Sequence, residues 1–335
     1  MDTGLRQVLD LFGGLALFLF GMDCMSEALE QAAGERMKRV LRALTRTPWS
    51  GAAAGAVVTA VLQSSSATTV MVLGAVSAGL LDLPSALAVI FGANLGTTMT
   101  AQLLAFRVED LLGLLLFAGF FLSAAGRSRT THEMGRAVFS LGLLFEGMKT
   151  IGQTMTPLAE NPLFLRGMEA VRQSPAAGLL LGLGMTLTVQ SSSATIAVLQ
   201  NVAQQAGPDG LHSILGLRGA VPILLGDNVG TTITALLASI GRPRDAKRAA
   251  AAHCCFNLSG SLVCLCLLPW FVRLVEAVSP EGMELDIISR QIANAHTLFN
   301  ALCTLVWLPL LPVMEKLVLW LIPEKGSEKK KKPWS

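Results

Sequence analysis

The polar block QSSSAT occurs twice in this sequence, at residues 63–68 and 190–195, and each copy interrupts an apolar stretch. These stretches, residues 51–81 and 176–206, are too long for one simple membrane span of about 20 residues and too short for two. Backbone that is not hydrogen-bonded within a helix is tolerated at membrane depth only where protein or water surrounds it. We therefore expect each stretch to form two half-helices that break at the polar block, as in a re-entrant helical hairpin.

The composition supports a membrane setting for these hairpins. Only 15% of the 335 residues are charged and 52% are hydrophobic, whereas about a quarter of the residues in a soluble domain are charged. The sequence therefore predicts an all-α polytopic membrane protein. Seven further apolar segments are predicted to cross the bilayer: 8–29, 84–106, 109–125, 134–156, 213–240, 249–271 and 288–312.

The distribution of Lys and Arg predicts how the chain is oriented. With seven crossings and two hairpins, the basic segments 30–48, 127–133 and 242–248 and the Lys-rich tail fall on one side. Cytoplasmic loops are enriched in Lys and Arg, so we expect the N-terminus outside and the C-terminus inside, in the cell inner (cytoplasmic) membrane. Residues 30–48 resemble a basic amphipathic helix on the membrane surface. The basic clusters are explained in this way without nucleic acid as a partner.

The duplication extends well beyond the QSSSAT block. The segment FGANLGTTMT (91–100) matches LGDNVGTTIT (225–234), and FLFGM (18–22) resembles LFEGM (144–148) at an offset of 126 residues. The predicted layout sends the two hairpins into the membrane from opposite sides. Two repeats of inverted topology are typical of secondary transporters whose binding site lies near the bilayer midplane.

These observations predict the following organisation of the chain. The expected parts are a first transmembrane helix with a basic interfacial helix, the hairpin and core helices of repeat 1, the leading helix and outer interfacial segment of repeat 2, the hairpin, core helices and final spans of repeat 2, and a short charged cytoplasmic tail. Their bounds are 1–48, 49–133, 134–175, 176–322 and 323–335.

The polar blocks offer the chemistry of a site for an anion together with cations. Amide, hydroxyl and main-chain oxygens suit hard cations such as Na⁺, and an oxygen set without His or Cys argues against a transition metal. Helix N-termini exposed at the breaks attract anions, and the amides of Asn94 and Asn228 could donate hydrogen bonds. The blocks contain no Arg or Lys, so co-bound cations would balance the charge of the anion. No other cofactor is expected.

Three polar residues outside the blocks are ambiguous. Asp227 lies in a predicted span and has Ala93 as its counterpart in the first copy; it could bind a cation or form a structural salt bridge, for example with Arg218. His253 and His296 lie in a second duplicated motif, AHCCFN and AHTLFN. Structural hydrogen bonds are the favoured interpretation of both histidines.

The doubled QSSSAT block, followed each time by a G-x-N-x-G-T-T helix, resembles the type II sodium-dependent phosphate cotransporters. The segment GLALFLFGMDCMSEAL (14–29) is similar to the bacterial branch of that family. The resemblance implies Na⁺-driven symport of inorganic phosphate by alternating access, with phosphate, Na⁺ and the lipid bilayer as partners and no enzymatic activity. Many bacterial members carry a C-terminal PhoU-like domain, which we do not expect in this chain. A homodimer is an open alternative.

With the motif residues carried over, the predicted site is as follows. The predicted phosphate ligands are Ser64, Ser65, Ser66, Ser191, Ser192, Ser193, Asn94 and Asn228. The predicted sodium ligands are Gln63, Gln190, Ser65, Ser192, Thr68, Thr195, Asn94, Thr97, Thr98, Asp227, Asn228, Thr231 and Thr232.

Other functions remain open at this stage. A Na⁺-coupled transporter could carry sulfate, arsenate or a small carboxylate in place of phosphate. An intramembrane serine hydrolase would need a base beside its nucleophile, for which His253 and His296 are the candidates within the predicted spans. A passive channel would not accumulate its substrate against a gradient.

Overall fold

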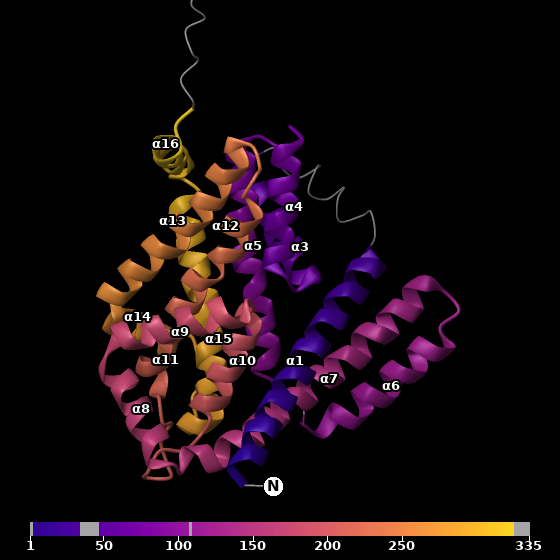
Figure 1. The fold of residues 1–335 in the computed structure, drawn as a ribbon, viewed down its shortest axis with the longest axis vertical. Coiled ribbons are helices and arrows are strands. Elements are labelled where there is room, and N and C mark those ends of the chain that lie inside the picture. Colours follow the sequence, from indigo (N-terminus) through magenta and orange to yellow (C-terminus); the bar gives the residue numbers. More distant parts are fainter. Residues whose placement is uncertain (1–2, 34–46, 107–108, 325–335) are drawn as a thin grey trace, which may run out of the picture.

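The structure is a computed structural model that describes residues 3–33, 47–106 and 109–324. All its named elements are helices, so the all-α prediction is confirmed for this part of the chain. Figure 1 shows their arrangement. The elements are α1 (Thr3–Ala33), α3 (Pro48–Leu62), α4 (Ser65–Ser77), α5 (Leu83–Leu104), the 3₁₀ helix η1 (Glu109–Leu111), α6 (Leu112–Ala125), α7 (Arg129–Ala159), α8 (Pro162–Gln173), α9 (Pro175–Val189), α10 (Ser192–Ala203), α11 (Gly216–Gly230), α12 (Thr232–Ala238), α13 (Arg244–Cys266), α14 (Leu268–Ala277), α15 (Glu284–Trp307) and α16 (Leu311–Leu321).

The first polar block separates α3 from α4, and these two helices pack together as hairpin 1. Thr47 and Ser50 form a capping box at the start of α3, in which each side chain accepts a hydrogen bond from the other residue's backbone N–H. Pro48 follows at the first helical turn, where its missing N–H leaves no bond unmade. Asp82 caps α5 through the backbone N–H of Ser85. Local capping thus fixes where hairpin 1 begins and where the next helix starts.

The second polar block separates α9 from α10, which pack together as hairpin 2. Ser174 caps α9, and Pro175 again stands at the first helical turn. In Figure 1, hairpin 1 lies in the upper half of the molecule and hairpin 2 in the lower half. Each hairpin precedes a helix with the G-x-N-x-G-T-T motif, α5 or α11.

The helices α5 and α11 form the centre of the molecule, because most of their apolar stretches are buried, 78% for α5 and 67% for α11 with α12. Glycines allow the hairpins to approach them closely. A Cβ atom added to Gly92 would lie 1.8 Å from the carbonyl oxygen of Ala52 in α3, and one added to Gly226 would lie 2.0 Å from that of Leu179 in α9. The first arm of each hairpin is therefore in backbone contact with its central helix.

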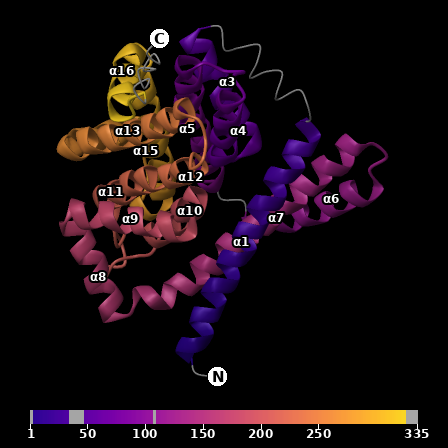
Figure 2. The same cartoon turned by 45° about the horizontal axis from the view of Figure 1, so that its top comes forward.

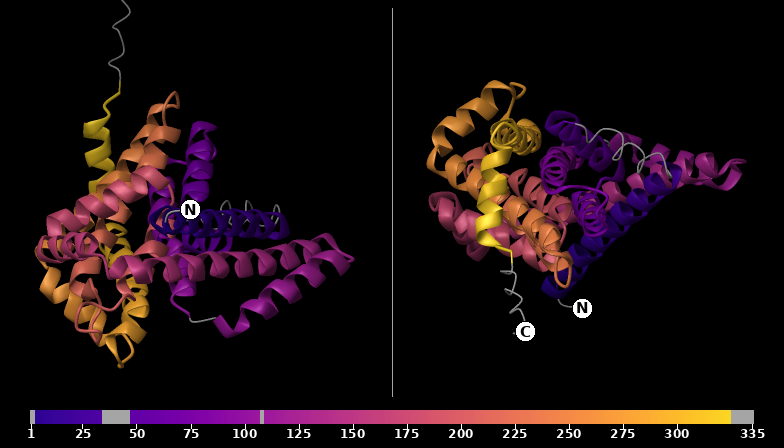
Figure 3. Two further views of the ribbon diagram at one scale, coloured as in Figure 1. Left: turned by 60° about the horizontal axis from the view of Figure 1, so that its bottom comes forward. Right: turned by 90° about the horizontal axis from the view of Figure 1, so that it is seen from above.

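A separate group of helices consists of α1, α6 and α7, which extend away from the centre in Figures 2 and 3. The helices α1 and α7 cross at the duplicated segments FLFGM (18–22) and LFEGM (144–148). A Cβ added to Gly21 would lie 2.6 Å from the backbone nitrogen of Leu144, and one added to Gly147 would lie 2.4 Å from that of Phe18. The glycines of these two segments thus allow the backbones of α1 and α7 to approach each other closely.

Prolines end the last two predicted crossings earlier than expected. The span predicted at 249–271 ends at Cys266, and α14 begins just before Pro269. The span predicted at 288–312 ends at Trp307, just before Pro309, and α16 continues at an angle of 86° to α15. Proline lacks the N–H that a continuing helix needs, which explains both breaks.

Length and composition support five of the seven predicted crossings. The helices α1, α5, α11 with α12, and α13 are each apolar and long enough to span a bilayer, and α15 with α16 qualifies if the bent pair counts as one span. The predictions at 109–125 and 134–156 differ from this result. The α6 helix has 14 residues, about 21 Å at 1.5 Å per residue, and α7 has 31 residues but carries several charged side chains.

Many large apolar side chains lie exposed on the described helices. Phe12, Phe117 and Trp270, for example, are each more than 60% exposed, as expected where lipid replaces water around a multi-pass protein. Two sequence predictions concern segments outside the described residues. The predicted basic interfacial helix at 30–48 falls largely on 34–46, and the predicted charged tail at 323–335 falls largely on 325–335.

Candidate functional site

Both polar blocks break their helix pair with the same backbone geometry. The helix before each block ends in a glutamine in the left-handed region, Gln63 with φ 54° and Gln190 with φ 55°. These are the only non-glycine residues with positive φ in the described part of the chain. The next residue, Ser64 or Ser191, is extended and caps the following helix. The predicted break at each QSSS block is therefore present.

The serine caps leave helix N-termini at the break. The side chain of Ser64 accepts a hydrogen bond from the backbone N–H of Ala67, and that of Ser191 from the N–H of Ala194. The remaining N–H groups in the first turns of α4 and α10 have no intrahelical partner. They carry partial positive charge, which favours an anion.

A pair of threonines stands behind each hairpin tip. In hairpin 1 the hydroxyl of Thr59 lies 2.9 Å from that of Thr68, which donates to the backbone oxygen of Ser64. In hairpin 2 the hydroxyl of Thr186 lies 3.0 Å from that of Thr195, which donates to the backbone oxygen of Ser191. These contacts join the two helices of each hairpin and stabilise the backbone geometry at the break.

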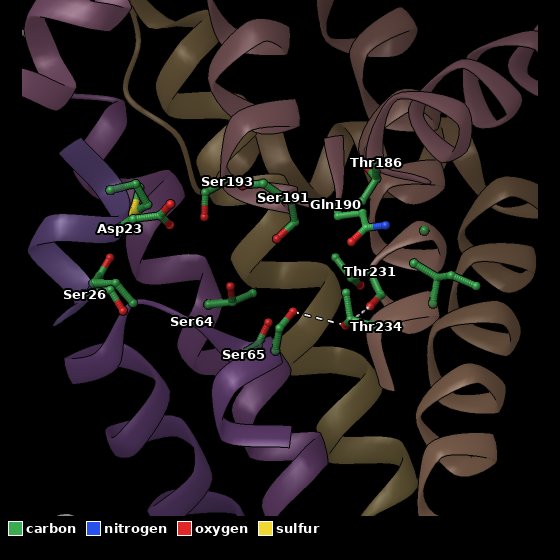
Figure 4. Close-up of a pocket in the computed structure, with 17 residues that line it drawn as sticks. Asp23, Ser26, Ser64, Ser65, Thr186, Gln190, Ser191, Ser193, Thr231 and Thr234 are labelled. Carbon is green, nitrogen blue, oxygen red and sulfur yellow. Dashed lines mark hydrogen bonds between the residues drawn. The ribbon is translucent and has the colours of Figure 1, made fainter. Parts of the chain in front are cut away.

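The two hairpin tips face each other across one cavity of about 150 Å³. In Figure 4, Ser64 and Ser65 lie on one side of it, and Ser191 and Ser193 lie on the other. The lining residues are Met22, Asp23, Ser26, Gln63, Ser64, Ser65, Ser66, Thr97, Thr186, Gln190, Ser191, Ser192, Ser193, Gly230, Thr231, Ile233 and Thr234. Two blocks 127 residues apart in sequence thus form one polar chamber.

Several hydrogen bonds tie this chamber to the surrounding helices. The hydroxyl of Ser66 lies 3.1 Å from that of Thr234 in α12, a contact drawn as a dashed line in Figure 4. Thr100 of α5 donates to the amide oxygen of Gln63 at 2.8 Å. On the other side, Ser26 of α1 donates to the backbone oxygen of Leu62 at 2.5 Å. Hairpin 1 is therefore attached to both repeats and to α1.

Ten of the predicted ligands line the chamber: Gln63, Ser64, Ser65, Ser66, Thr97, Gln190, Ser191, Ser192, Ser193 and Thr231. The other predicted ligands lie outside its lining: Thr68, Asn94, Thr98, Thr195, Asp227, Asn228 and Thr232. Thr68 and Thr195 belong to the threonine pairs behind the tips. Thr98 donates to the backbone oxygen of Leu95 in its own helix, and Thr232 donates to that of Val229 at the end of α11. Direct ligation by these four threonines stays a prediction that the geometry of the cavity does not support.

Asn94 is buried between α5 and α13, away from the chamber. Its amide group donates to the backbone oxygen of Ile90. Its side-chain oxygen lies 3.0 Å from Nε2 of His253 and accepts from the amide of Asn257 at 3.4 Å. The asparagine therefore has partners for its amide and its oxygen without a ligand.

Asn228 repeats this arrangement between α11 and α15. It donates to the backbone oxygen of Leu224, and its side-chain oxygen lies 3.3 Å from Nε2 of His296 and 3.2 Å from the amide nitrogen of Asn300. The duplicated AH-x-x-FN motif thus supplies the partners of the duplicated asparagine. Hydrogen bonding, the favoured interpretation of both histidines, is what the geometry shows.

Asp227 is fully buried directly behind the chamber wall. One carboxylate oxygen accepts a hydrogen bond from Thr186 at 2.6 Å, while the other has no partner among the described residues. The salt bridge considered from the sequence, with Arg218, does not form; that arginine lines a separate surface cavity. A buried carboxyl group with one unpaired oxygen must be protonated or meet a cation, because an isolated buried charge is very costly.

Sequence reasoning missed seven residues of the lining: Met22, Asp23, Ser26, Thr186, Gly230, Ile233 and Thr234. Thr186 and Thr234 lie close in sequence to the motifs that predicted the site. Met22, Asp23 and Ser26 come from α1, more than 35 residues before the first block. The sequence offered two signals for them: they lie in the segment 14–29 that carries the family resemblance, and Asp23 and Ser26 are polar side chains in an apolar helix.

Comparison with known proteins extends this picture. A family model described as Na⁺/Pi-cotransporter matches the chain twice, over residues 17–153 and 147–278. The uncharacterized protein YqeW of Bacillus subtilis is 31% identical over 267 residues, which cover 80% of this chain and 84% of YqeW. The putative inorganic phosphate export protein YjbB of Salmonella typhimurium is 29% identical over 283 residues, 84% of this chain and 50% of YjbB.

A mammalian relative matches over a shorter region. The sodium-dependent phosphate transport protein 2A of Rattus norvegicus is 35% identical over 107 residues, which cover 31% of this chain and 17% of that protein. The chain spans about half the length of the phosphate export protein that it matches. No solved structure matches the chain. The double match of the family model, over most of the sequence and over both polar blocks, shows that the chain belongs to the Na⁺/Pi-cotransporter family.

Proposed function

We propose that this chain is a Na⁺-coupled symporter that carries inorganic phosphate across the cytoplasmic membrane by alternating access. The observation that supports this most strongly is the chamber between the two hairpin tips, lined by both QSSS blocks. Its serines can donate hydrogen bonds to phosphate oxygens. The first turns of α4 and α10 add unpaired N–H groups and the positive ends of two helix dipoles.

Charge balance supports coupling to a cation. No Lys, Arg or His lines the chamber in the described part of the chain, so nothing there offsets the full charge of a phosphate ion. Hydroxyl and amide oxygens of the same lining are suitable ligands for Na⁺. An anion that needs the cation for charge balance binds poorly without it, and such a dependence is the thermodynamic basis of coupling.

The arrangement of the hairpins supports alternating access. Their tips come together at the chamber from opposite halves of the molecule (Figures 1 and 4), as expected for inverted repeats around a central site. In this mechanism the hairpins move against the remaining helices and open the chamber to one side at a time. The orientation that we propose, with the N-terminus outside and the C-terminus in the cytoplasm, follows the Lys and Arg distribution.

Labelled phosphate uptake into proteoliposomes tests the proposal. With an inward Na⁺ gradient we expect uptake roughly tenfold faster than with an equal choline gradient, a factor within the usual range of coupling energies. Phosphate should accumulate transiently above its outside concentration, which a passive channel cannot achieve. Equal uptake in Na⁺ and choline would refute the coupling. The reverse gradient, with phosphate inside, determines whether the protein also carries phosphate outward.

Competition experiments identify the anion. Arsenate has nearly the same shape and protonation as phosphate, so it should compete with labelled phosphate. Sulfate carries no proton at neutral pH and cannot donate the hydrogen bond that HPO₄²⁻ can give to a serine oxygen. Sulfate or a small carboxylate that competes better than arsenate would assign a different substrate.

The geometry gives no support to the alternative of a serine hydrolase. A nucleophilic serine needs a base within hydrogen-bond reach. His253 and His296 bond to the asparagines behind the chamber and do not line it. The cotransporter family to which the chain belongs is a family of transporters.

The buried carboxyl group of Asp227 gives a prediction about stoichiometry. We assign it to a Na⁺ ion that repeat 1, with Ala93 at this position, does not bind. Asp227→Asn keeps the size and the partner Thr186 but removes the charge, so one positive charge fewer should move per phosphate. The ratio of charge to phosphate, from the reversal potential of proteoliposomes, measures this. Asp10→Asn, an exposed acid of α1, is the control, and an unchanged ratio in Asp227→Asn contradicts the assignment.

A further inference from the structure

The chamber has one charged side chain in its described lining, and this side chain is an acid. Asp23 of α1 lines the cavity together with Ser26, and Figure 4 shows both at the side where α1 passes the hairpin tips. Asp23 is exposed to the chamber and has no hydrogen bond or ion pair with any described residue. A free carboxylate on the wall of an anion site would repel the anion unless a cation accompanies it.

The nearby basic residue is already engaged. Arg136 of α7 lies 3.4 Å from the carboxylate of Glu27 and 2.9 Å from that of Glu133. Glu27 follows Asp23 by one helical turn, so the guanidinium group of Arg136 pairs with Glu27 and not with Asp23. The charge of Asp23 therefore remains available to a ligand in the chamber.

Further oxygen atoms lie near Asp23, in the corner of the chamber that α1 and the end of α3 form. The C-terminal end of α3 lies here, because Ser26 donates to the backbone oxygen of its last residue, Leu62. Carbonyl groups at a helix C-terminus carry partial negative charge. The side-chain amide of Gln63 donates to one of them, that of Ala60. Carboxylate, hydroxyl and main-chain carbonyl oxygens together are the ligand set of a hard cation.

The anion and the cation would then occupy different parts of the same chamber. The N-termini of α4 and α10 are electropositive, while the corner formed by α1 and the end of α3 is electronegative. We propose that Asp23 and Ser26 form a Na⁺ subsite next to the phosphate position, where the negative end of the α3 dipole favours a cation. This subsite deepens the proposed function and depends on it.

The duplication indicates that this subsite exists once. At the offset of 126 residues that relates FLFGM (18–22) to LFEGM (144–148), the counterpart of Asp23 is Lys149 and that of Ser26 is Gly152. Both counterparts line a different cavity, between α5, α7 and α10. A lysine and a glycine cannot replace the two oxygen ligands, so repeat 2 has no equivalent cation corner. Lys149 therefore provides a matched control.

Equilibrium binding of radiolabelled Na⁺ to the purified protein, without phosphate, tests the subsite. Asp23→Asn keeps the size of the side chain and should raise the Na⁺ concentration for half-saturation by about tenfold or more, since even indirect disturbance of metal ligands often costs that much. Ser26→Ala should raise it by a smaller factor. Lys149→Gln and Glu30→Gln, an exposed acid on the same helix, should leave it unchanged.

Uptake assays separate the subsite from the proposed function. Wild-type protein that shows no dependence on Na⁺ refutes the function itself. If wild-type uptake depends on Na⁺ but Asp23→Asn needs no more Na⁺ than wild type, the subsite is refuted and the function stands. At saturating Na⁺, Asp23→Asn should retain near-normal affinity for phosphate. If Asp23→Asn fails to fold, Ser26→Ala decides in its place, and an unchanged Na⁺ requirement there refutes the subsite.

Discussion

Alanine at Gly226 is expected to destabilise the protein severely, although alanine is the best helix former. A Cβ atom there would lie 2.0 Å from the carbonyl oxygen of Leu179, and one at Gly182 would lie 1.9 Å from that of Ile223. Both contacts are with backbone atoms, so α9 and α11 would have to move apart. Overpacking of this kind costs about 3 kcal/mol or more. We expect a large loss of thermal stability in detergent for either variant.

The first repeat should behave in the same way. Gly55 and Gly92 occupy the equivalent positions, with added Cβ atoms 2.0 Å from the oxygen of Val89 and 1.8 Å from that of Ala52. Gly184 is the matched control, because it lies in α9 with no atom within 4 Å of an added Cβ. Gly184→Ala should stabilise by up to about 1 kcal/mol through helix propensity. If Gly184→Ala is as harmful as Gly182→Ala, close packing is not the reason for these glycines.

Asn94→Ala is expected to have the second largest effect. Its side-chain oxygen is the acceptor shared by His253 and Asn257, and all three residues are buried. Alanine would leave two buried donors without an acceptor, each at about 1–3 kcal/mol. Thermal melting should therefore show a loss of roughly 2–6 kcal/mol. Asn228→Ala should match it, since His296 and Asn300 depend on that oxygen.

The network contains its own control for this prediction. Asn257→Ala removes one donor but leaves Asn94 bonded to His253, and the amide oxygen that it removes has no partner among the described residues. Its cost should be clearly smaller than that of Asn94→Ala. The reverse order would show that Asn257, and not the shared acceptor, is the centre of the network.

The breaks in the hairpins could be predicted because they depend on local chemistry. Serine is a good N-cap, and three consecutive serines inside an apolar run offer several caps where a continuous helix would bury polar groups. Ser64 and Ser191 are the caps that form. The length of each apolar run also predicted two half-helices in place of one long helix. Local rules also explain why prolines end α13 and α15, which hydropathy alone had placed too far along the chain.

The remaining part of the site depends on packing that one sequence does not reveal. No motif near Asp23 in the sequence indicates that α1 passes the tip of hairpin 1, where Ser26 donates a hydrogen bond to Leu62. The G-x-N-x-G-T-T motif predicted Asn94 as a ligand because amides suit phosphate. Only the position of α13 behind α5 shows that His253 occupies the oxygen of that amide. Long-range neighbours of this kind decide whether a polar group faces a ligand or another helix.

The two left-handed glutamines share a backbone geometry but differ in the freedom of their side chains. The amide oxygen of Gln63 accepts from Thr100 and its amide nitrogen donates to the backbone oxygen of Ala60. The side chain of Gln190 has no hydrogen-bond partner among the described residues, although its backbone N–H donates to Thr186. Fixing a mobile side chain costs conformational entropy. An ion that enters the chamber therefore meets one glutamine side chain that is already fixed and one that can still rotate. The two repeats share a fold but would contribute unequally to binding this ion.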